Sequence, residues 1–178
     1  MPTYTKAPSS VAIMATELLC RFESHKPLLD AKVKIDLLFA RANLDDKGNP
    51  VGFAITEQGR QVLGKTRVVS LKDRAKGNAD AEILLDGDWW ESESAHRREA
   101  LLDHELHHIS VVTSRQGAIK TDDLNRPKLK LRKHDWQFGW FDVIAERHGE
   151  FSVERQQAAE IWDKSGQLYW EAISPAKP

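Results

Sequence analysis

The stretch REALLDHELHHISVV, residues 98–112, holds three of the seven histidines of the chain within five positions. Its apolar residues recur at helical spacing, which predicts an amphipathic helix with one buried face. On a helix of about 3.6 residues per turn, His104 and His108 project from the same side, and Glu105 lies on the flank of His108. His107 projects from the opposite flank, so it is a weaker ligand candidate. The arc that carries the motif also holds Leu101, Leu102, Ile109 and Val112.

This motif has the HExxH pattern of zinc hydrolases. A catalytic zinc ion takes three protein ligands and keeps its fourth position for water, which a neighbouring carboxylate can deprotonate. The alternative is a chance pattern in a histidine-rich chain. However, two histidines and a glutamate on an apolar face are costly to bury unless they are satisfied, and a metal satisfies all three. We therefore interpret His104 and His108 as Zn²⁺ ligands and Glu105 as the general base.

The motif supplies only two ligands, so a third has to come from another part of the chain. We predict His134, which lies where a short strand at 127–134 meets an aromatic-rich helix. Asp135 is the alternative, although it is equally suited to be the N-cap of that helix. The candidate third ligands downstream of the motif are His134, Asp135, Asp142, Glu146, His148 and Glu150.

The other polar residues near these positions have simpler explanations. His148 is expected in the last turn of a helix before Gly149, where a cationic side chain is favourable. His25 and His96 have no partner pattern and are predicted to lie at the surface. Asp103 is predicted to lie on the solvated face of the motif helix.

The composition of the chain limits the possible classes of protein. With 178 residues, of which 40% are hydrophobic, the chain can form one domain with a sizeable core. Its 26 basic and 27 acidic residues do not require a nucleic-acid or membrane partner. The single cysteine, Cys20, excludes an internal disulfide framework, and no apolar run is long enough to span a membrane. A cytoplasmic protein is expected.

The pattern along the chain predicts the α+β class, with a small, mostly antiparallel sheet packed against the motif helix. We expect a single domain over 1–178, with a core at about 10–150 and a C-terminal helical extension at about 151–172. Turn residues separate the elements. The expected helices are 9–22, 91–112, 135–149 and 153–170, and the expected strands lie in 31–42, 51–71 (two strands, around Gly59), 81–90 and 127–134.

The runs AEILLDGDWW and RREALLDHELHH, followed by LRKHDWQFGWFDVIAERHG, resemble the putative phage metallopeptidase family, a minimal zincin. The early strand VKIDLLFA extends this resemblance to most of residues 10–150. The resemblance implies metal ligands at His104, His108 and His134, with Glu105 as the general base. It departs from the family pattern at the extra histidine, His107. The layout is more loosely similar to SprT-type and ImmA-type zincins, and a phage protein would act in the host cytoplasm.

In the zincin arrangement, an extended peptide pairs with an exposed strand edge beside the motif helix. The stretch 81–90 is the expected edge, and a peptide or protein is the expected substrate. Glu105 would take a proton from water and pass it to the leaving amine. Tyr169, His148 and Arg132 are candidates for stabilising the oxyanion, and the sequence does not rank them.

Two other functions compete with the peptidase. The basic strand 126–133 places Lys128, Lys130 and Arg132 on one face, where they could bind a nucleic acid or a host protein. Lysines that protect an edge strand from aggregation explain the same pattern. The other rival is a non-catalytic zincin-like binding protein, although a structural metal site has no need of Glu105. The partner-binding surface of such a protein could be formed by tryptophans, although tryptophans pack more often in cores. The six tryptophans are Trp89, Trp90, Trp136, Trp140, Trp162 and Trp170.

Overall fold

The computed structural model describes residues 2–57, 59–134 and 141–165, the last five by their backbone alone. The chain divides into two compact units, Met1–Lys133 and His134–Pro178. The expectation of a single domain stays a prediction.

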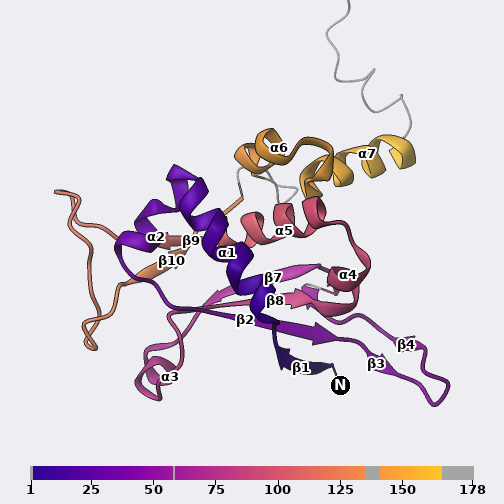
Figure 1. Ribbon diagram of the computed structural model, residues 1–178, viewed down its shortest axis with the longest axis horizontal. Helices are drawn as coiled ribbons and strands as arrows, with labels where there is room; N and C mark the ends of the chain where they lie inside the picture. Colours follow the sequence, from indigo (N-terminus) through magenta and orange to yellow (C-terminus); the bar gives the residue numbers. More distant parts are fainter. Residues whose placement is uncertain (1, 58, 135–140, 166–178) are drawn as a thin grey trace, which may run out of the picture. The chain divides into compact units, whose positions relative to one another are not determined.

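The first unit is built on a four-stranded sheet (Figure 1). Strand β2 pairs with β8 in parallel, and the β1–β2 and β7–β8 pairs are antiparallel. The α+β class with a small, mostly antiparallel sheet is therefore confirmed. In spatial order the strands are β1 (Thr3–Lys6), β2 (Ile35–Arg41), β8 (Ala81–Asp86) and β7 (Gly64–Val68).

The position of β8 in this order corrects one prediction. Because β8 is hydrogen-bonded to β2 on one side and to β7 on the other, it has no free edge. The expectation that 81–90 offers an edge to a substrate is therefore wrong. The edge strand on that side is β7, which pairs only with β8 among the described residues and contacts the motif helix.

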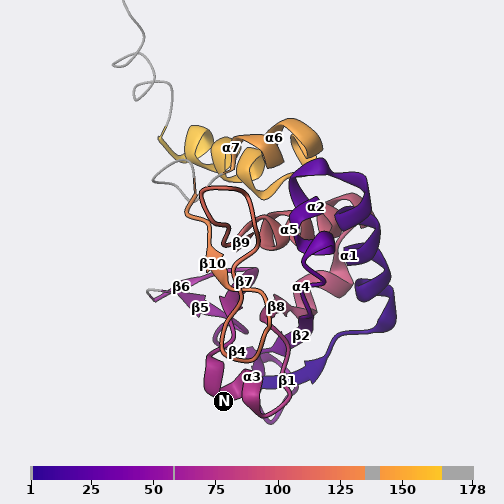
Figure 2. The same ribbon diagram turned by 90° about the vertical axis from the view of Figure 1, so that its left-hand side faces the viewer.

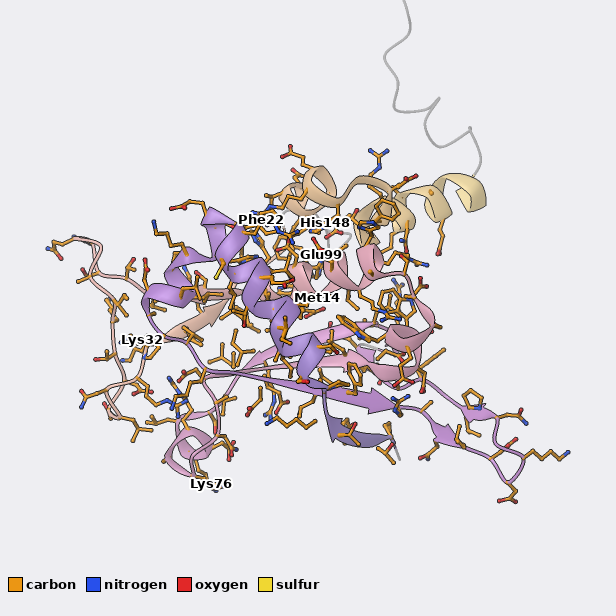
Figure 3. The ribbon with its side chains drawn as sticks, viewed as in Figure 1. Met14, Phe22, Lys32, Lys76, Glu99 and His148 are labelled. Carbon is orange, nitrogen blue, oxygen red and sulfur yellow. The ribbon has the colours of Figure 1, made fainter. Side chains whose placement is uncertain are left out.

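Helices α1 (Ser9–Arg21) and α5 (Ala95–His107) lie on the same face of the sheet (Figures 1 and 2). The strands alternate as a half-buried sheet requires, and Phe39, Ile83 and Leu85 are fully buried. The two helices contact each other, and Figure 3 labels Met14 of α1 and Glu99 of α5. The core of the unit lies between these helices and the sheet.

The segment between β8 and α5 differs from the predicted continuous strand. β8 ends at Asp86, whose side chain accepts hydrogen bonds from the backbone N–H groups of Asp88 and Trp89, both at 3.1 Å. This N-cap starts the short helix α4 (Gly87–Ser92). Gly87 leaves room for Phe39, since a Cβ at this glycine would lie 3.2 Å from the Phe39 Cβ.

The motif helix is shorter than the predicted segment 91–112. Ser94 is the N-cap of α5, and the helix ends at His107 with His108 as its C-cap residue. The β-branched residues that follow form strand β9 (Ile109–Val111). The motif therefore lies at the C-terminal end of the helix and not in its middle.

Strand β9 pairs with β10 (Leu129–Leu131), which confirms the short strand expected in 127–134. The connection between them folds back toward α3 (Leu71–Ala75) through Asp122 and Arg126. Gly59, with φ of 78°, lies in the turn that joins β5 to β6. The remaining elements of the unit are η1 (Glu23–His25), α2 (Lys26–Asp30), β3 (Asn43–Leu44), β4 (Pro50–Val51), β5 (Thr56–Glu57) and β6 (Arg60–Gln61).

The described part of the second unit, 141–165, is helical. Helix α6 (Asp142–His148) is followed by Gly149, with φ of 52°, which confirms the predicted C-cap. A short η2 (Gly149–Phe151) leads into α7 (Val153–Ser165), which ends next to Gly166. Asp135, Trp136 and Tyr169 lie outside the described residues. In the described part of both units, no helix is long and apolar enough to cross a membrane.

Candidate metal centre

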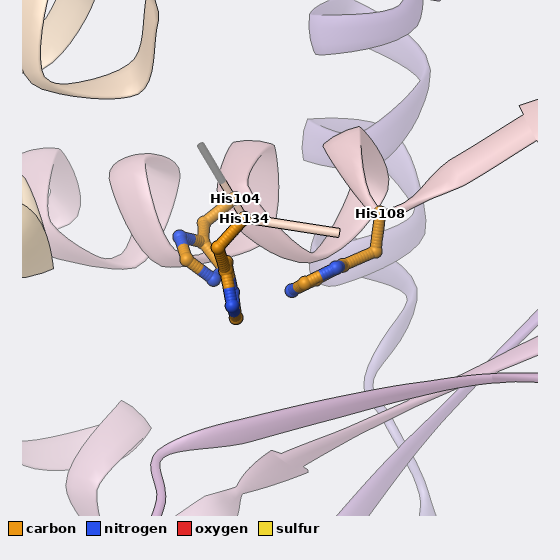
Figure 4. Close-up of side chains that lie close together, drawn as sticks. All are labelled: His104, His108 and His134. Atoms are coloured by element: carbon orange, nitrogen blue, oxygen red, sulfur yellow. The ribbon is translucent and has the colours of Figure 1, made fainter. Parts of the chain in front are cut away.

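Three histidines converge on one side of α5 (Figure 4). The ligand nitrogens of His104, His108 and His134 all lie within 4.8 Å of one another. His104 is buried, His108 is half-buried and His134 is exposed. The rings of His104 and His108 meet edge to face, with centroids 5.0 Å apart. The structure thus brings together the two histidines of the motif and the predicted third histidine.

Strand β10 explains how the distant His134 reaches this position. The register pairs Leu131 with Ile109, so the chain leaves β10 beside the end of α5. The backbone N–H of Arg132 then donates to the carbonyl oxygen of His108 at 2.6 Å. His134 follows only two residues later. Its position is therefore set by the strand pairing and by this backbone hydrogen bond.

Arg132 also fixes the orientation of the His108 ring. The Nδ1 atom of His108 lies 3.0 Å from the carbonyl oxygen of Arg132. A carbonyl oxygen only accepts, so Nδ1 carries the proton in this hydrogen bond. The lone pair of His108 is then on Nε2, which is the usual arrangement of a metal-binding histidine with a carbonyl partner.

The donor set fits a zinc ion. Three imidazoles with an adjacent carboxylate match catalytic sites that have three protein ligands. Zinc–nitrogen bonds of about 2.0–2.1 Å place two ligands of a tetrahedral ion roughly 3.3 Å apart. The 4.8 Å spread of the three histidines is therefore within reach of small side-chain rotations.

Glu105 is buried and held by the edge strand β7. The hydroxyl of Thr66 donates to its Oε2 atom at 2.7 Å and lies 3.0 Å from its main-chain oxygen. At Gly64 a Cβ atom would lie only 2.4 Å from the Oε1 atom of Glu105, so only glycine leaves room for the carboxylate. The alternation of β7 points both residues toward α5. Sequence patterns place Gly64 and Thr66 on one strand face but cannot show which helix that face meets.

Two residues expected at the surface lie inside the protein. Asp103 is 0% exposed and His25 is 1% exposed. The Oδ1 atom of Asp103 lies 2.5 Å from Nε2 of His25. Because η1 and α1 pack on this side of α5, the predicted solvated face of the helix is buried. His96, by contrast, is exposed as predicted.

Arg132 also differs from its predicted place on a basic strand face. Lys128 and Lys130 are exposed, but Arg132 is half-buried and its Nη1 atom donates to Nε2 of His107. The strand 126–133 therefore does not present three solvated cations on one face. The prediction of a nucleic-acid or host-protein partner at this strand finds no support.

The oxyanion candidates and the tryptophans lie in different parts of the chain. Of the oxyanion candidates, Arg132 contacts His107, His148 ends α6 in the second unit, and Tyr169 lies outside the described residues. Trp90 packs in the core against Phe39, and the ring of Trp89 lies under the guanidinium of Arg97. The described part of the structure does not include Asp135, Trp136, Trp140, Trp170 or the side chain of Trp162.

Comparison with known proteins gives one match. The model of a family described as "Putative phage metallopeptidase" matches residues 3–164, which is most of the chain. No curated protein and no solved structure matches the chain.

Proposed function

The chain belongs to the putative phage metallopeptidase family, and we propose that it is a zinc-dependent peptidase of peptide or protein substrates. In this proposal His104, His108 and His134 bind the metal, and Glu105 is the general base. The convergence of three histidine nitrogens within 4.8 Å of one another carries the proposal. A metallopeptidase family implies a metal cofactor, and three imidazoles are a donor set that zinc accepts.

Zinc bound by these histidines would act as a Lewis acid and would lower the pKa of water. The residues of the chain supply the proton transfers. Glu105 takes a proton from the attacking water and passes it to the leaving amine. The Thr66 hydroxyl holds the Oε2 atom of Glu105, so the carboxylate keeps one orientation through both transfers.

Strand β7 is the surface that we assign to the substrate backbone. It is an edge strand that contacts α5, and its residues Gly64 and Thr66 border Glu105. An extended peptide could add to this edge through main-chain hydrogen bonds, which place a scissile bond near Glu105 without requiring one particular sequence. This assignment replaces the 81–90 segment predicted from the sequence.

The experiment that tests the proposal compares the wild-type protein with two variants. One is the double variant His104→Ala, His108→Ala, and the other is Glu105→Gln. Zinc content is measured by elemental analysis, and cleavage is measured on a library of quenched fluorescent peptides. Because His96 is exposed, His96→Ala serves as the histidine control.

We expect about one zinc per chain in the wild type, in Glu105→Gln and in the control, and none in the double variant. Glu105→Gln should lower kcat by about 10²–10⁴, which is the usual contribution of general acid–base catalysis. A wild-type protein without zinc would refute the metal centre. Zinc binding without cleavage of any peptide, or cleavage unaffected by Glu105→Gln, would refute the peptidase mechanism and favour a non-catalytic zincin.

A further inference from the structure

His107 is the histidine of the 104–108 stretch that does not join the metal-binding group. It is buried, and its Nε2 atom accepts a hydrogen bond from the guanidinium of Arg132. A guanidinium can only donate, so Nε2 carries the lone pair and the ring is neutral in this contact. His107 is therefore an acceptor placed at the end of α5, beside the metal ligands.

The buried pair of His25 and Asp103 restricts the position of His107. The ring of His25 meets the ring of His107 edge to face, with centroids 5.8 Å apart. His25 in turn contacts the carboxylate of Asp103 at 2.5 Å, with side-chain exposures of 2% and 0%. Asp103 and His107 lie one helical turn apart on α5, and η1 brings His25 against both. Packing on this side leaves His107 little freedom to move.

Arg132 connects this buried group to the metal ligands. Its side chain is hydrogen-bonded to His107. Its backbone N–H donates to the carbonyl oxygen of His108 at 2.6 Å, and its carbonyl oxygen accepts from Nδ1 of His108 at 3.0 Å. Three hydrogen bonds therefore attach one residue of the returning strand to the end of α5. The ring orientation of His108 and the starting point of the segment that carries His134 both depend on Arg132.

We propose that His107 is a positioning residue of the metal centre, which anchors Arg132 and through it sets His108 and His134. This inference rests on the three-histidine site of the proposed function. Without the acceptor at His107, the Arg132 guanidinium would lose this hydrogen bond. The partly buried charge of Arg132 would then need a hydrogen bond from its N–H groups to water instead. The backbone of 132–134 would then sample more positions, and metal binding would have to restrict them again.

The test measures zinc affinity, by competition with a chromophoric chelator, and does not depend on cleavage. His107→Leu removes the acceptor, His107→Gln restores one through its amide oxygen, and Arg132→Ala removes the donor. Two exposed residues supply matched controls, namely His96→Leu on α5 and Lys130→Ala on β10. Near-ultraviolet circular dichroism of the metal-free proteins reports whether each variant keeps its fold.

We expect His107→Leu and Arg132→Ala each to weaken zinc binding by about 10- to 100-fold, which is the usual effect of losing an outer-shell partner. His107→Gln should bind within a few-fold of the wild type, and both controls should match it. Because both residues act through one hydrogen bond, the double variant His107→Leu, Arg132→Ala should bind zinc no more weakly than the single variant with the lower zinc affinity.

Wild-type affinity in His107→Leu, or equal losses in His107→Gln and His107→Leu, would overturn the inference. Additive losses in the double variant would also overturn it. If His107→Leu does not fold, the half-buried Arg132→Ala decides alone, and unchanged affinity there rejects the proposal. A wild-type protein that binds no zinc refutes the metal centre itself. A zinc-binding protein that cleaves nothing refutes only the peptidase function.

Discussion

Two clusters of polar side chains differ in how their charges are balanced. In the arginine–aspartate cluster, Arg74 pairs with Asp80 and with Asp122, the latter at 2.6 Å, and Arg126 pairs with Asp80 at 2.8 Å. This cluster thus contains two cations and two anions. The histidine cluster at the end of α5 instead gathers imidazoles and the carboxylate of Glu105.

The difference separates a structural cluster from a site that is suited to bind a ligand. The arginine–aspartate cluster provides its own counter-charges and ties the 112–128 connection to α3. The histidine cluster concentrates groups that donate electron pairs, and an added cation improves its charge balance. Burial of polar residues is common to both clusters, so charge balance is the property that distinguishes them.

The largest expected effect on stability is in the arginine–aspartate cluster. Asp80→Ala leaves Arg74 and Arg126 without this partner, and breaking a buried ion pair from one side costs about 3–5 kcal/mol. The free energy of unfolding, measured by urea denaturation, should fall by this amount in the metal-free protein. Zinc affinity of the folded variant should be unchanged.

The exposed pair of Arg67 and Glu82 is the matched control for that variant. The Arg67 side chain is 56% exposed, so Arg67→Ala should cost at most about 1 kcal/mol. Equal losses at Asp80 and Arg67 would contradict the view that the buried cluster stabilises the fold.

The next effect is the response of the histidine cluster to metal. At a free zinc concentration about 100 times Kd, binding should stabilise the wild type by about 2.7 kcal/mol. The double variant His104→Ala, His108→Ala should lose this gain, whereas Arg67→Ala should keep it. Thermal unfolding with and without zinc measures both responses. A zinc-dependent shift in the double variant would place the metal elsewhere.

A smaller effect is expected where β7 meets Glu105. Thr66→Val removes the hydroxyl that donates to Oε2, and kcat should fall about tenfold, which corresponds to about 1.4 kcal/mol. Thr66→Ser keeps the donor and should retain most of the activity. Zinc content should not change in either variant. Equal kcat values in Thr66→Val and the wild type would show that this hydrogen bond does not orient the base.

The smallest effect concerns acid stability of the arginine–aspartate cluster. Burial raises the pKa of Asp122, but backbone hydrogen bonds from Arg126 and Leu124 and the charges of Arg74 and Arg126 outweigh this effect, so its pKa lies below the ordinary value of an aspartate. A depressed pKa contributes stability that is fully present above the unfolded-state value and is lost as the pH falls through the folded-state value.

Between pH 7 and pH 5 this contribution should therefore be constant, and it should decline below about pH 4. Asp122→Asn should remove that part of the acid dependence. The measurement is the free energy of unfolding as a function of pH for the wild type and this variant. Parallel curves below pH 4 would contradict a depressed pKa at Asp122.

Local patterns predicted much of the fold correctly. The first helix, the short strand at 129–131, the C-cap at Gly149 and the α+β class are all confirmed. The errors lie where local signals compete. The Asp86 side chain starts a helix within an apolar run, and the β-branched residues after His108 end one. The first boundary depends on the Asp86 side-chain cap and the second on the pairing of β9 with β10, and periodicity reveals neither.

For the candidate site, local sequence patterns identify the residues with metal-binding chemistry and place His104 and His108 on one side of a helix. This information is local, because helical geometry relates residues four positions apart. Tertiary folding brings His134 beside these two histidines, places β7 next to Glu105, and buries His25 and Asp103 near His107. Those contacts join residues that are far apart in the chain, so strand register and helix packing set them rather than local spacing.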